Sequence, residues 1–287
     1  MSYQIDLGII GGTGVYQMDG VKVIDQLSIE TPFGKPSSPI MIADVSGKKI
    51  AFLARHGIGH TIPPSEINHR ANIYAYKSLA IKSIIGISAC GSLREDFAPG
   101  DIVIPDQIID FTKDRERTFF GTGLVAHVST ADPFCSHLSK LLFESVIKKD
   151  VQVHQNGTMI TIEGPRFSTK AESNLFRSWG VSIIGMTTSP EIFLAREAEI
   201  CYASFAHVTD YDVWHVSEKP VTVDMILNVL HQNSQVANAS ILNLITNYQP
   251  YDCDCHNALA SALTTNPDYI DPDQLKKLDI LVNKYLK

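Results

Sequence analysis

Apolar segments of strand length alternate with helix-like segments along most of this chain. Residues 7–10 form the first strand-like run, and residues 83–88 and 181–186 form later ones. Helix-like patterns lie between them, for example over residues 168–179, and glycine or polar residues follow many of the strand-like runs. Alternation of this kind favours a single α/β domain with a mixed, largely parallel twisted sheet that is flanked by helices.

The composition is consistent with one large core. The chain has 287 residues, of which 44% are hydrophobic, so it can bury a sizeable interior. We interpret residues 1–250 as one domain and residues 251–287 as a C-terminal helical extension packed on it, because the tail is richer in Asn, Asp and Pro. A helix is expected over residues 272–286 with Asp271 as its cap.

Charge and hydropathy exclude several classes of partner. The net charge of −7 argues against a nucleic-acid partner, for which a basic face is expected. The sequence has neither the pattern of a signal peptide nor an apolar run long enough to span a membrane. We therefore expect a cytoplasmic protein without a membrane partner, and the odd number of cysteines, five, fits reduced thiols there.

Cys253 and Cys255 form a tight pair in the tail. The pair can be a redox dithiol, half of a metal site or two incidental thiols, and the last interpretation is favoured because no second pair lies elsewhere in the sequence. His127 has no neighbouring His or carboxylate at the spacing of metal ligands. Since zinc requires several ligands in register, we expect no metal ion and no cofactor.

Four strand-like runs end in residues that suit an anion. They are Thr13 within the glycine run 11–14, Arg55 with His56, Ser88 with Ala89, and Met186 with Thr187. Ligands of open α/β sheets bind beyond the carboxyl ends of strands, so these groups are expected to meet in space. Backbone N–H groups, hydroxyls and the donor fork of an arginine together suit one phosphate ion.

Each of these motifs has another interpretation when it is taken alone. The run 11–14 lacks the third glycine of a dinucleotide fingerprint and the Gly-Lys-Ser/Thr of a Walker loop, and a plain tight turn explains it about as well. Arg55 and His56 can equally be a surface pair. Only the combination of four strand ends favours an anion site.

The run Thr-Asp-Tyr-Asp at residues 209–212 follows the apolar segment 200–208, which has the pattern of a buried strand. Side chains two apart share a face of a strand, so Asp210 and Asp212 are expected to point the same way, with Tyr211 on the other side. Two carboxylates are costly to bury without partners. A 6-aminopurine would use both, because it has a ring nitrogen that takes a proton and an exocyclic amine that donates one.

Residues 163–168 are the remaining polar cluster after a strand. Phe167 has a flat face that suits stacking on a base, and a core position is an equally good interpretation from residue type alone. No Gly-x-Ser-x-Gly nucleophile elbow occurs in the chain.

Together these motifs resemble the trimeric purine nucleoside phosphorylase family, and within it the members that act on 5'-methylthioadenosine. The resemblance runs from about Leu7 to about Leu230. It is carried by residues 10–14 (Ile-Gly-Gly-Thr-Gly), 31–37, 53–57, 89–95, 99–101, 161–168 (Thr-Ile-Glu-Gly-Pro-Arg-Phe-Ser), 186–188 and 209–212. The tail with Cys253 and Cys255 matches only some members.

The resemblance implies a pentosyltransferase of purine and methionine salvage, which converts 5'-methylthioadenosine and phosphate to adenine and 5-methylthioribose 1-phosphate. It implies phosphate as co-substrate, no cofactor, and a homo-oligomer, most simply a trimer. Phosphate would be bound by Thr13, Arg55, His56, Ser88, the backbone of Ala89, and Thr187. The nucleoside would be bound by Phe167, Ser168, Met186, Asp210, Tyr211, Asp212, Val223, Ile226 and Leu227, with His127 from a neighbouring subunit.

The resemblance also implies roles within this set. Phe167 would stack on the base, Met186 would pack against the ribose, Asp210 would protonate N7 and Asp212 would hold the 6-amino group. A free Asp titrates at about 3.9, so burial and the neighbouring Asp212 would have to raise the pKa of Asp210. The alternatives are a phosphorylase for inosine, guanosine or methylthioinosine, then a nucleosidase that uses water, then a nucleotide-binding oxidoreductase or regulatory module that uses the glycine-rich loop.

Overall fold

The computed structural model describes residues 3–12, 21–147, 152–215 and 222–286, and for residues 147 and 225–235 it describes the backbone alone. The strands are β1 (Leu7–Gly11), β2 (Lys22–Leu27), β3 (Ile40–Val45), β4 (Lys48–Ala54), β5 (Ser83–Ser92), β6 (Ile102–Ile104), β7 (Gln107–Phe111), β8 (Val153–Gln155), β9 (Thr158–Ile162), β10 (Ile183–Gly185) and β11 (Cys201–Asp210). The helices are α1 (His69–Ser78), α2 (Ser136–Ile147), α3 (Lys170–Ser178), α4 (Thr188–Glu197), α5 (Val223–Asn247), α6 (Pro272–Lys277) and α7 (Asp279–Val282).

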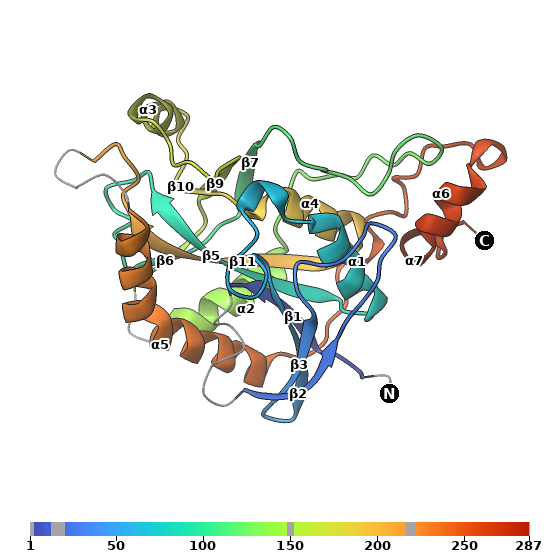
Figure 1. Ribbon diagram of the computed structural model, residues 1–287, viewed down its shortest axis with the longest axis horizontal. Coiled ribbons are helices and arrows are strands. Elements are labelled where there is room, and N and C mark those ends of the chain that lie inside the picture. The colour runs from blue at the N-terminus through green and yellow to red at the C-terminus, as the bar shows by residue number, and fades with distance from the viewer. Residues whose placement is uncertain (1–2, 13–20, 148–151, 216–221, 287) are drawn as a thin grey trace.

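The predicted α/β architecture is confirmed (Figure 1). The central strands β4, β1, β5 and β11 are parallel neighbours, and β2, β3 and β4 form an antiparallel meander at one edge. Every residue of β1 and of β11 is buried, as expected for parallel strands with helices on both faces. Because these strands run the same way, their carboxyl ends lie along one edge of the sheet.

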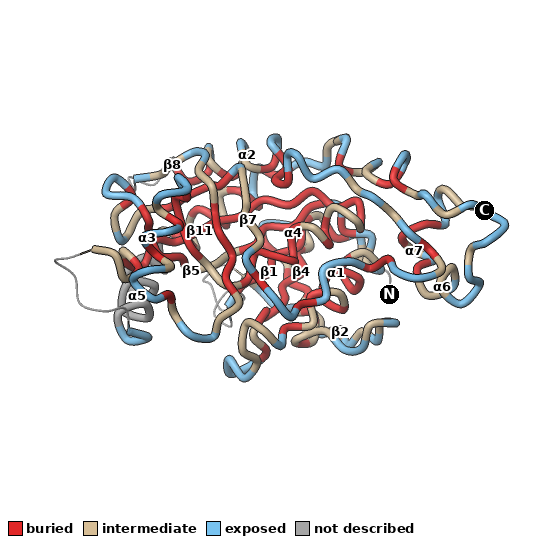
Figure 2. The backbone as a smooth tube through the Cα atoms, turned by 90° about the horizontal axis from the view of Figure 1, so that it is seen from above, coloured by how far each residue is buried: buried red, intermediate tan, exposed pale blue. Residues whose placement is uncertain are grey.

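The two faces of the sheet carry separate cores. Leu7 and Ile9 of β1 pack in a cluster with residues of α2 and α5, whereas Ile10 belongs to a cluster with residues of α1 and α4. This follows from the alternation of side chains along a strand. Figure 2 shows the buried strands as a continuous interior under an exposed outer layer.

β5 is longer than the sequence predicted, because it runs on through residues 89–92 instead of stopping at residue 88. β11 pairs with it from Ser83 to Gly91, whereas on the other side residues 84–86 pair with β1 and residues 91–92 pair with β10 in the antiparallel sense, so the sheet forks on that side. Gly91 permits the fork, since a Cβ at this position would lie 2.9 Å from Oδ1 of Asp210 and 3.1 Å from Ile184.

Several boundaries differ from the sequence prediction. Pro63 and Pro64 favour the start of a helix, but α1 begins only at His69, after a 3-10 turn at Pro64–Glu66, because the Asn68 side chain caps it by accepting from the amide of Ala71. α3 begins after a capping box between Thr169 and Glu172, rather than at residue 168. The strands β2, β7 and β8 were missed, since they are short or exposed and lack a continuous apolar pattern.

The tail packs on the main body. Leu278, Leu281 and Val282 are buried in the same cluster as Ile73 and Tyr74 of α1. The single helix expected over residues 272–286 is two short helices, α6 and α7. The side chain of Asp271 caps α6 by accepting from the amides of residues 273 and 274, as predicted. Among the helices of the described residues, none is long and apolar enough to cross a membrane.

Candidate active site

The register of the sheet gathers most of the predicted site residues. The amide of Arg55, which follows β4, donates to the carbonyl of Gly11 at the end of β1 (2.9 Å). On β5, Ala89 lies opposite His207 of β11, and Asp210 lies opposite Gly91. β10 pairs with Gly91 through Ile184, so the residues that follow β10, Met186 and Thr187, also reach this edge of the sheet.

The two acids lie side by side, but not in the way that the strand pattern predicted. β11 ends at Asp210, and Asp212 lies in a turn with a φ of +50°. The turn folds the chain back, so that the amide of Asp212 donates to Oδ1 of Asp210 (2.8 Å) while the hydroxyl of Thr209 donates to Oδ2 (2.7 Å). Both acids pack over Gly91, and this shared face comes from the turn instead of from strand alternation.

Burial changes the acidity of both acids. Asp210 is 7% exposed and Asp212 is 6% exposed. Burial raises the pKa of Asp210 to about 6, and the charge of Asp212 adds to this effect, against the hydrogen bonds from Thr209 and from the Asp212 amide. Burial also raises the pKa of Asp212 above its ordinary value. The pair can therefore hold a proton close to neutral pH.

The segment that carries Phe167 packs against Met186. Gly164 has a φ of +67°, and a Cβ on it would lie 2.7 Å from Sδ of Met186, so only glycine fits between the two segments. Phe167 is half-buried, and the hydroxyl of Ser168 is buried without a hydrogen-bond partner among the described residues. Phe167, Met186 and Asp212 are thus held around one region.

Arg115 holds the segments of Glu163 and Met186 together through hydrogen bonds. The sequence pattern did not identify it as a site residue. Its Nη1 donates to the carbonyls of Met186 and Ser189 (both 2.8 Å), and its Nη2 donates to the carbonyl of Glu163 (2.6 Å). Its Nε donates to Oε1 of Glu163 (2.9 Å). One guanidinium therefore sets the relative position of the segments after β9 and β10. Arg115 stands in a stretch of mixed charges, so the sequence pattern does not distinguish it from a surface arginine.

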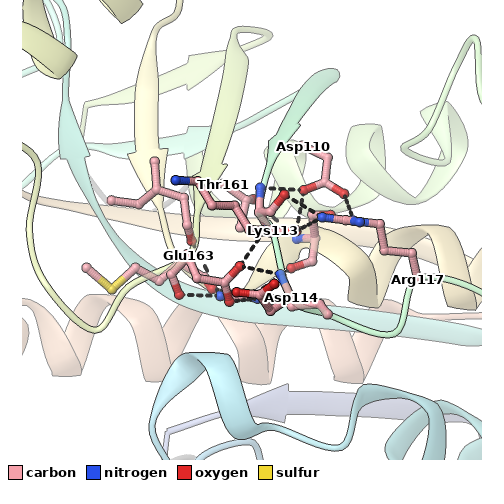
Figure 3. Close-up of polar contacts among 11 residues, drawn as sticks. Asp110, Lys113, Asp114, Arg117, Thr161 and Glu163 are labelled. Atoms are coloured by element: carbon pink, nitrogen blue, oxygen red, sulfur yellow. Dashed lines mark hydrogen bonds and ion pairs between the residues drawn. The ribbon is translucent and has the colours of Figure 1, made fainter.

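Glu163 completes the same network (Figure 3). Its carboxylate faces the backbone of the segment after β7, where Oε2 accepts from the amides of Lys113 (2.5 Å) and Asp114 (3.2 Å). Burial would raise the pKa of Glu163, but these amides and Arg115 lower it below the ordinary value. Glu163 therefore stays ionised and ties the segments after β7 and β9 to each other.

Arg55 lies deeper than a surface pair and is already bound to a carboxylate. Its Nε and Nη2 donate to the two oxygens of Glu191 in α4, each at 2.8 Å, and both side chains are at most 3% exposed. Nη1 donates to the carbonyl of Ile87 (2.8 Å), next to Ser88, and Nη2 also donates to the carbonyl of Ile10 (3.2 Å). One N–H of Nη1 is left for a ligand. Glu191 was missed as a site residue, because nothing in the local sequence links it to an arginine 136 residues earlier, although a buried arginine requires such a partner.

His56 lies beside Arg55 with a fixed ring. Its Nδ1 lies 2.9 Å from the carbonyl of Ile62, and since a carbonyl only accepts, Nδ1 carries the hydrogen. Burial lowers the pKa of His56 to about 4, and the nearby charge of Arg55 acts the same way. The ring is therefore neutral at pH 7, and its Nε2 is an acceptor.

Two hydroxyls at this edge are available to a ligand. The hydroxyl of Ser88 is buried and has no hydrogen-bond partner among the described residues. Thr187 is 6% exposed and precedes α4, yet its side chain makes no capping hydrogen bond to that helix. Ser189 has non-helical backbone angles, so the regular turns of α4 begin after it, and the hydroxyls of Ser88 and Thr187 are the groups that can donate to an anion here.

Some residues that were predicted to bind the nucleoside or phosphate do not lie with the strand ends, or lie outside the described residues. His127 is exposed, and its backbone pairs with Ala262 of the tail (N–O 2.8 Å) instead of with the strand ends. Val223 is 60% exposed at the start of α5. Tyr211, by contrast, lies between the two acids and stacks on His215 (ring centroids 4.6 Å apart). Thr13 and the side chains of Ile226 and Leu227 lie outside the described residues.

The chain is similar to known phosphorylases in sequence and in fold. Residues 6–246 match the family model of the phosphorylase superfamily. The S-methyl-5'-thioadenosine phosphorylase of Koribacter versatilis is 48% identical over 98% of this chain and 97% of its own length. A crystal structure of a methylthioadenosine phosphorylase from an antarctic soil metagenomic library has a TM-score of 0.91 and 44% identity, over 97% of this chain and 99% of its own.

A more distant relative was solved with a ligand. The methylthioadenosine phosphorylase of Schistosoma mansoni, in complex with adenine, has a TM-score of 0.81 and 38% identity, over 84% of this chain and 91% of its own. The similarity of sequence and of fold thus extends over nearly the whole chain. The chain belongs to the phosphorylase superfamily and, within it, to the S-methyl-5'-thioadenosine phosphorylases.

Proposed function

We propose that this protein uses phosphate to cleave 5'-methylthioadenosine, giving adenine and 5-methylthioribose 1-phosphate. The observation that carries the proposal is the pair of buried acids at the end of β11, in which Asp210 has a pKa raised to about 6. Phosphate attacks C1' as the C1'–N9 bond breaks, and the electron pair of that bond leaves with the base. A proton from Asp210 to N7 neutralises the departing adenine.

The carboxylate oxygen of Asp212 that is unpaired among the described residues favours a purine with a 6-amino group over one with a 6-oxo group. Its Oδ2 is buried and accepts no hydrogen bond from the described residues. An amine of adenine would donate to this oxygen and so supply its missing partner. The carbonyl of inosine or guanosine would instead place an oxygen against a carboxylate, which makes the alternative purine phosphorylase less favourable.

The phosphate site proposed here uses the groups that face the same edge of the sheet. The hydroxyls of Ser88 and Thr187, the backbone of Ala89 and the remaining N–H of Arg55 supply donors, and Thr13 is expected to add another. His56 supplies an acceptor at Nε2, which suits the P–OH group of a protonated phosphate. The phosphate would lie beneath the sugar, where its charge stabilises an oxocarbenium-like transition state.

The base and sugar would lie between Phe167 and Met186. The flat ring of Phe167 would stack on adenine, with Ser168 and Tyr211 beside it, and Met186 would pack against the ribose. The methylthio group would meet apolar side chains at the start of α5, for which Val223, Ile226 and Leu227 are the candidates.

A homotrimer is part of the proposal. His127 is exposed on its own chain and lies next to the tail, away from the strand ends, which supports a role in the site of a neighbouring subunit. Sedimentation analysis combined with activity measurement at decreasing protein concentration tests this: activity should fall as the oligomer dissociates.

The proposal also includes a cytoplasmic location for the protein. Within the chain, residues 1–250 would form the phosphorylase domain, and residues 251–287 would be its C-terminal extension.

Product analysis of 5'-methylthioadenosine with and without phosphate tests the function. We expect adenine and the sugar 1-phosphate only when phosphate is present. Free methylthioribose formed without phosphate would instead identify a nucleosidase. Parallel assays with inosine, guanosine and methylthioinosine should give much lower kcat/KM values, and a preference for any of them would contradict the assignment of Asp212.

A further inference from the structure

Four cysteines that are far apart in the sequence meet in the fold. Cys201 is the first residue of β11, at the opposite end from Asp210, and Cys135 directly precedes α2. Cys253 and Cys255 lie in the tail, around a 3-10 turn at Asp254–Asn257. The four sulfur atoms all lie within 4.8 Å of one another, and three of the four residues are buried.

The spacing of the sulfurs matches ligands around one ion. Sγ of Cys135 and Sγ of Cys253 are 3.8 Å apart. Zinc–sulfur bonds of about 2.3 Å in a tetrahedron place the sulfurs roughly 3.8 Å from each other. A disulfide would require about 2.0 Å. The arrangement is therefore that of four separate thiol ligands that converge on a common centre.

We propose that Cys135, Cys201, Cys253 and Cys255 form a tetrathiolate site for a soft divalent metal ion, with zinc as the best match. Four protein ligands leave no open position, so the ion is structural and takes no part in the chemistry at Asp210. It would fasten the tail to the first residue of β11 and to the start of α2. The site is independent of the proposed phosphorylase function.

The surroundings of the cluster suit a negatively charged metal–thiolate group. Nη1 of Arg196 lies 3.3 Å from Sγ of Cys255, and Nε2 of His256 lies 3.4 Å from Sγ of Cys201. The Tyr251 hydroxyl lies 3.6 Å from Sγ of Cys135. A divalent ion with four thiolates carries a charge of about −2, which donors and cations in the outer shell stabilise.

The ion also has a route of entry. A surface cavity of about 790 Å³ lies beside the cluster, and Cys253 forms part of its wall together with Lys82, Asp252, Asp254 and His256. Cys253 is the one partly exposed member of the four. A metal ion can therefore reach the site in the folded protein.

Along the sequence, only Cys253 and Cys255 lie close enough together to suggest a metal site. The Cys-x-Cys spacing in the tail is shorter than the spacing common in zinc fingers, and Cys135 and Cys201 are each isolated in the sequence. They join the pair only because the tail returns across the start of β11. The fold thus supplies the two ligands that the sequence pattern lacks.

Element analysis of the full-length protein tests the proposal. Protein purified under reducing conditions without chelators should contain about one zinc ion per chain. The variant Cys255→Ser should lose most of this metal, whereas Cys90→Ser should keep it, because Cys90 lies outside the cluster and donates to the carbonyl of His207. Equal metal content in both variants would contradict the site.

Cobalt substitution covers the case in which Cys255→Ser does not fold. Wild-type protein is stripped with a chelator under reducing conditions and is then loaded with Co²⁺. Tetrahedral thiolate ligation predicts sulfur-to-cobalt charge-transfer bands and, in the visible region, intense bands of the cobalt ion. The Tm should fall by several degrees when the metal is stripped and return when it is loaded again. Wild-type protein that binds neither zinc nor cobalt overturns the proposal. An intact mass lowered by disulfide formation in freshly purified protein overturns it as well.

Discussion

Arg55 and Glu191 form a two-pronged ion pair beneath the candidate phosphate site, with both N–O distances at 2.8 Å. The hydroxyl of Tyr202 also donates to Oε1 of Glu191 (2.7 Å). Burial would raise the pKa of Glu191, but the guanidinium lowers it to about 2, so the carboxylate stays charged. The guanidinium is consequently held in place before any ligand arrives, with Nη1 on the carbonyl of Ile87, which precedes Ser88 in the chain.

Glu191→Gln should destabilise the fold strongly. Removing this carboxylate leaves the charge of Arg55 buried without a counterion, which costs about 3–5 kcal/mol in buried pairs of this kind. Chemical denaturation measures the loss in the free energy of unfolding. The matched control is Asp96→Asn, which removes the partner of Arg94 in a fork of similar geometry on the surface and should cost less than about 1 kcal/mol. A similar loss in both variants would contradict the importance of burial.

Asp210→Asn should lower kcat for methylthioadenosine by about a hundred- to ten-thousand-fold, since an amide does not supply the proton for N7. Asp212→Asn should cost less in kcat, because Asp212 holds the exocyclic amine and does not transfer a proton. Steady-state kinetics of both variants at saturating phosphate decide between the roles. Small and equal losses would show that neither acid acts as the proton donor.

The pH dependence of kcat/KM should reflect the pKa of Asp210, which is raised to about 6. Asp210 acts in its protonated form, so the rate is highest below this pKa and falls as the pH rises through and beyond it. A full pH profile of the wild type checks the descending limb. The profile of Asp210→Asn is the control, because ionisation of phosphate affects both proteins while this limb should be absent from the variant.

Arg115→Lys should weaken nucleoside binding more than phosphate binding. A lysine cannot bind the carbonyls of Met186, Ser189 and Glu163 at once, so the segments that carry Met186 and Phe167 shift relative to each other. We expect the kcat/KM for nucleoside to fall about ten- to a hundred-fold, with the KM for phosphate little changed.

Arg117→Lys is the comparison for this change. Arg117 belongs to the same segment but pairs with Asp110 at a more exposed position, where a lysine can still provide a charge. It should leave the nucleoside KM close to that of the wild type. If both variants behave alike, or if the two KM values rise together in Arg115→Lys, the positioning role is wrong.

Much of the fold could be predicted because it depends on local patterns. The buried strands β1 and β11 are continuous apolar runs, and the cap of α6 at Asp271 is a local hydrogen bond. The edge strand β2 carries exposed side chains and has no such pattern, so it was missed. The continuation of β5 past residue 88 depends on its pairing with β11 and β10, both of which lie about ninety residues or more further along the chain.

The class of fold and the chemical character of the site could be predicted from the chain alone, because strand ends, glycines and acids are local features. Which groups become neighbours follows from the folded structure: Glu191 beside Arg55, Arg115 across Glu163 and Met186, and Cys135 with Cys255. The turn at Asp212 likewise sets the geometry of the two acids. Such relationships depend on the packing of distant segments, and burial within that packing changes the acidity and the partners that each side chain has.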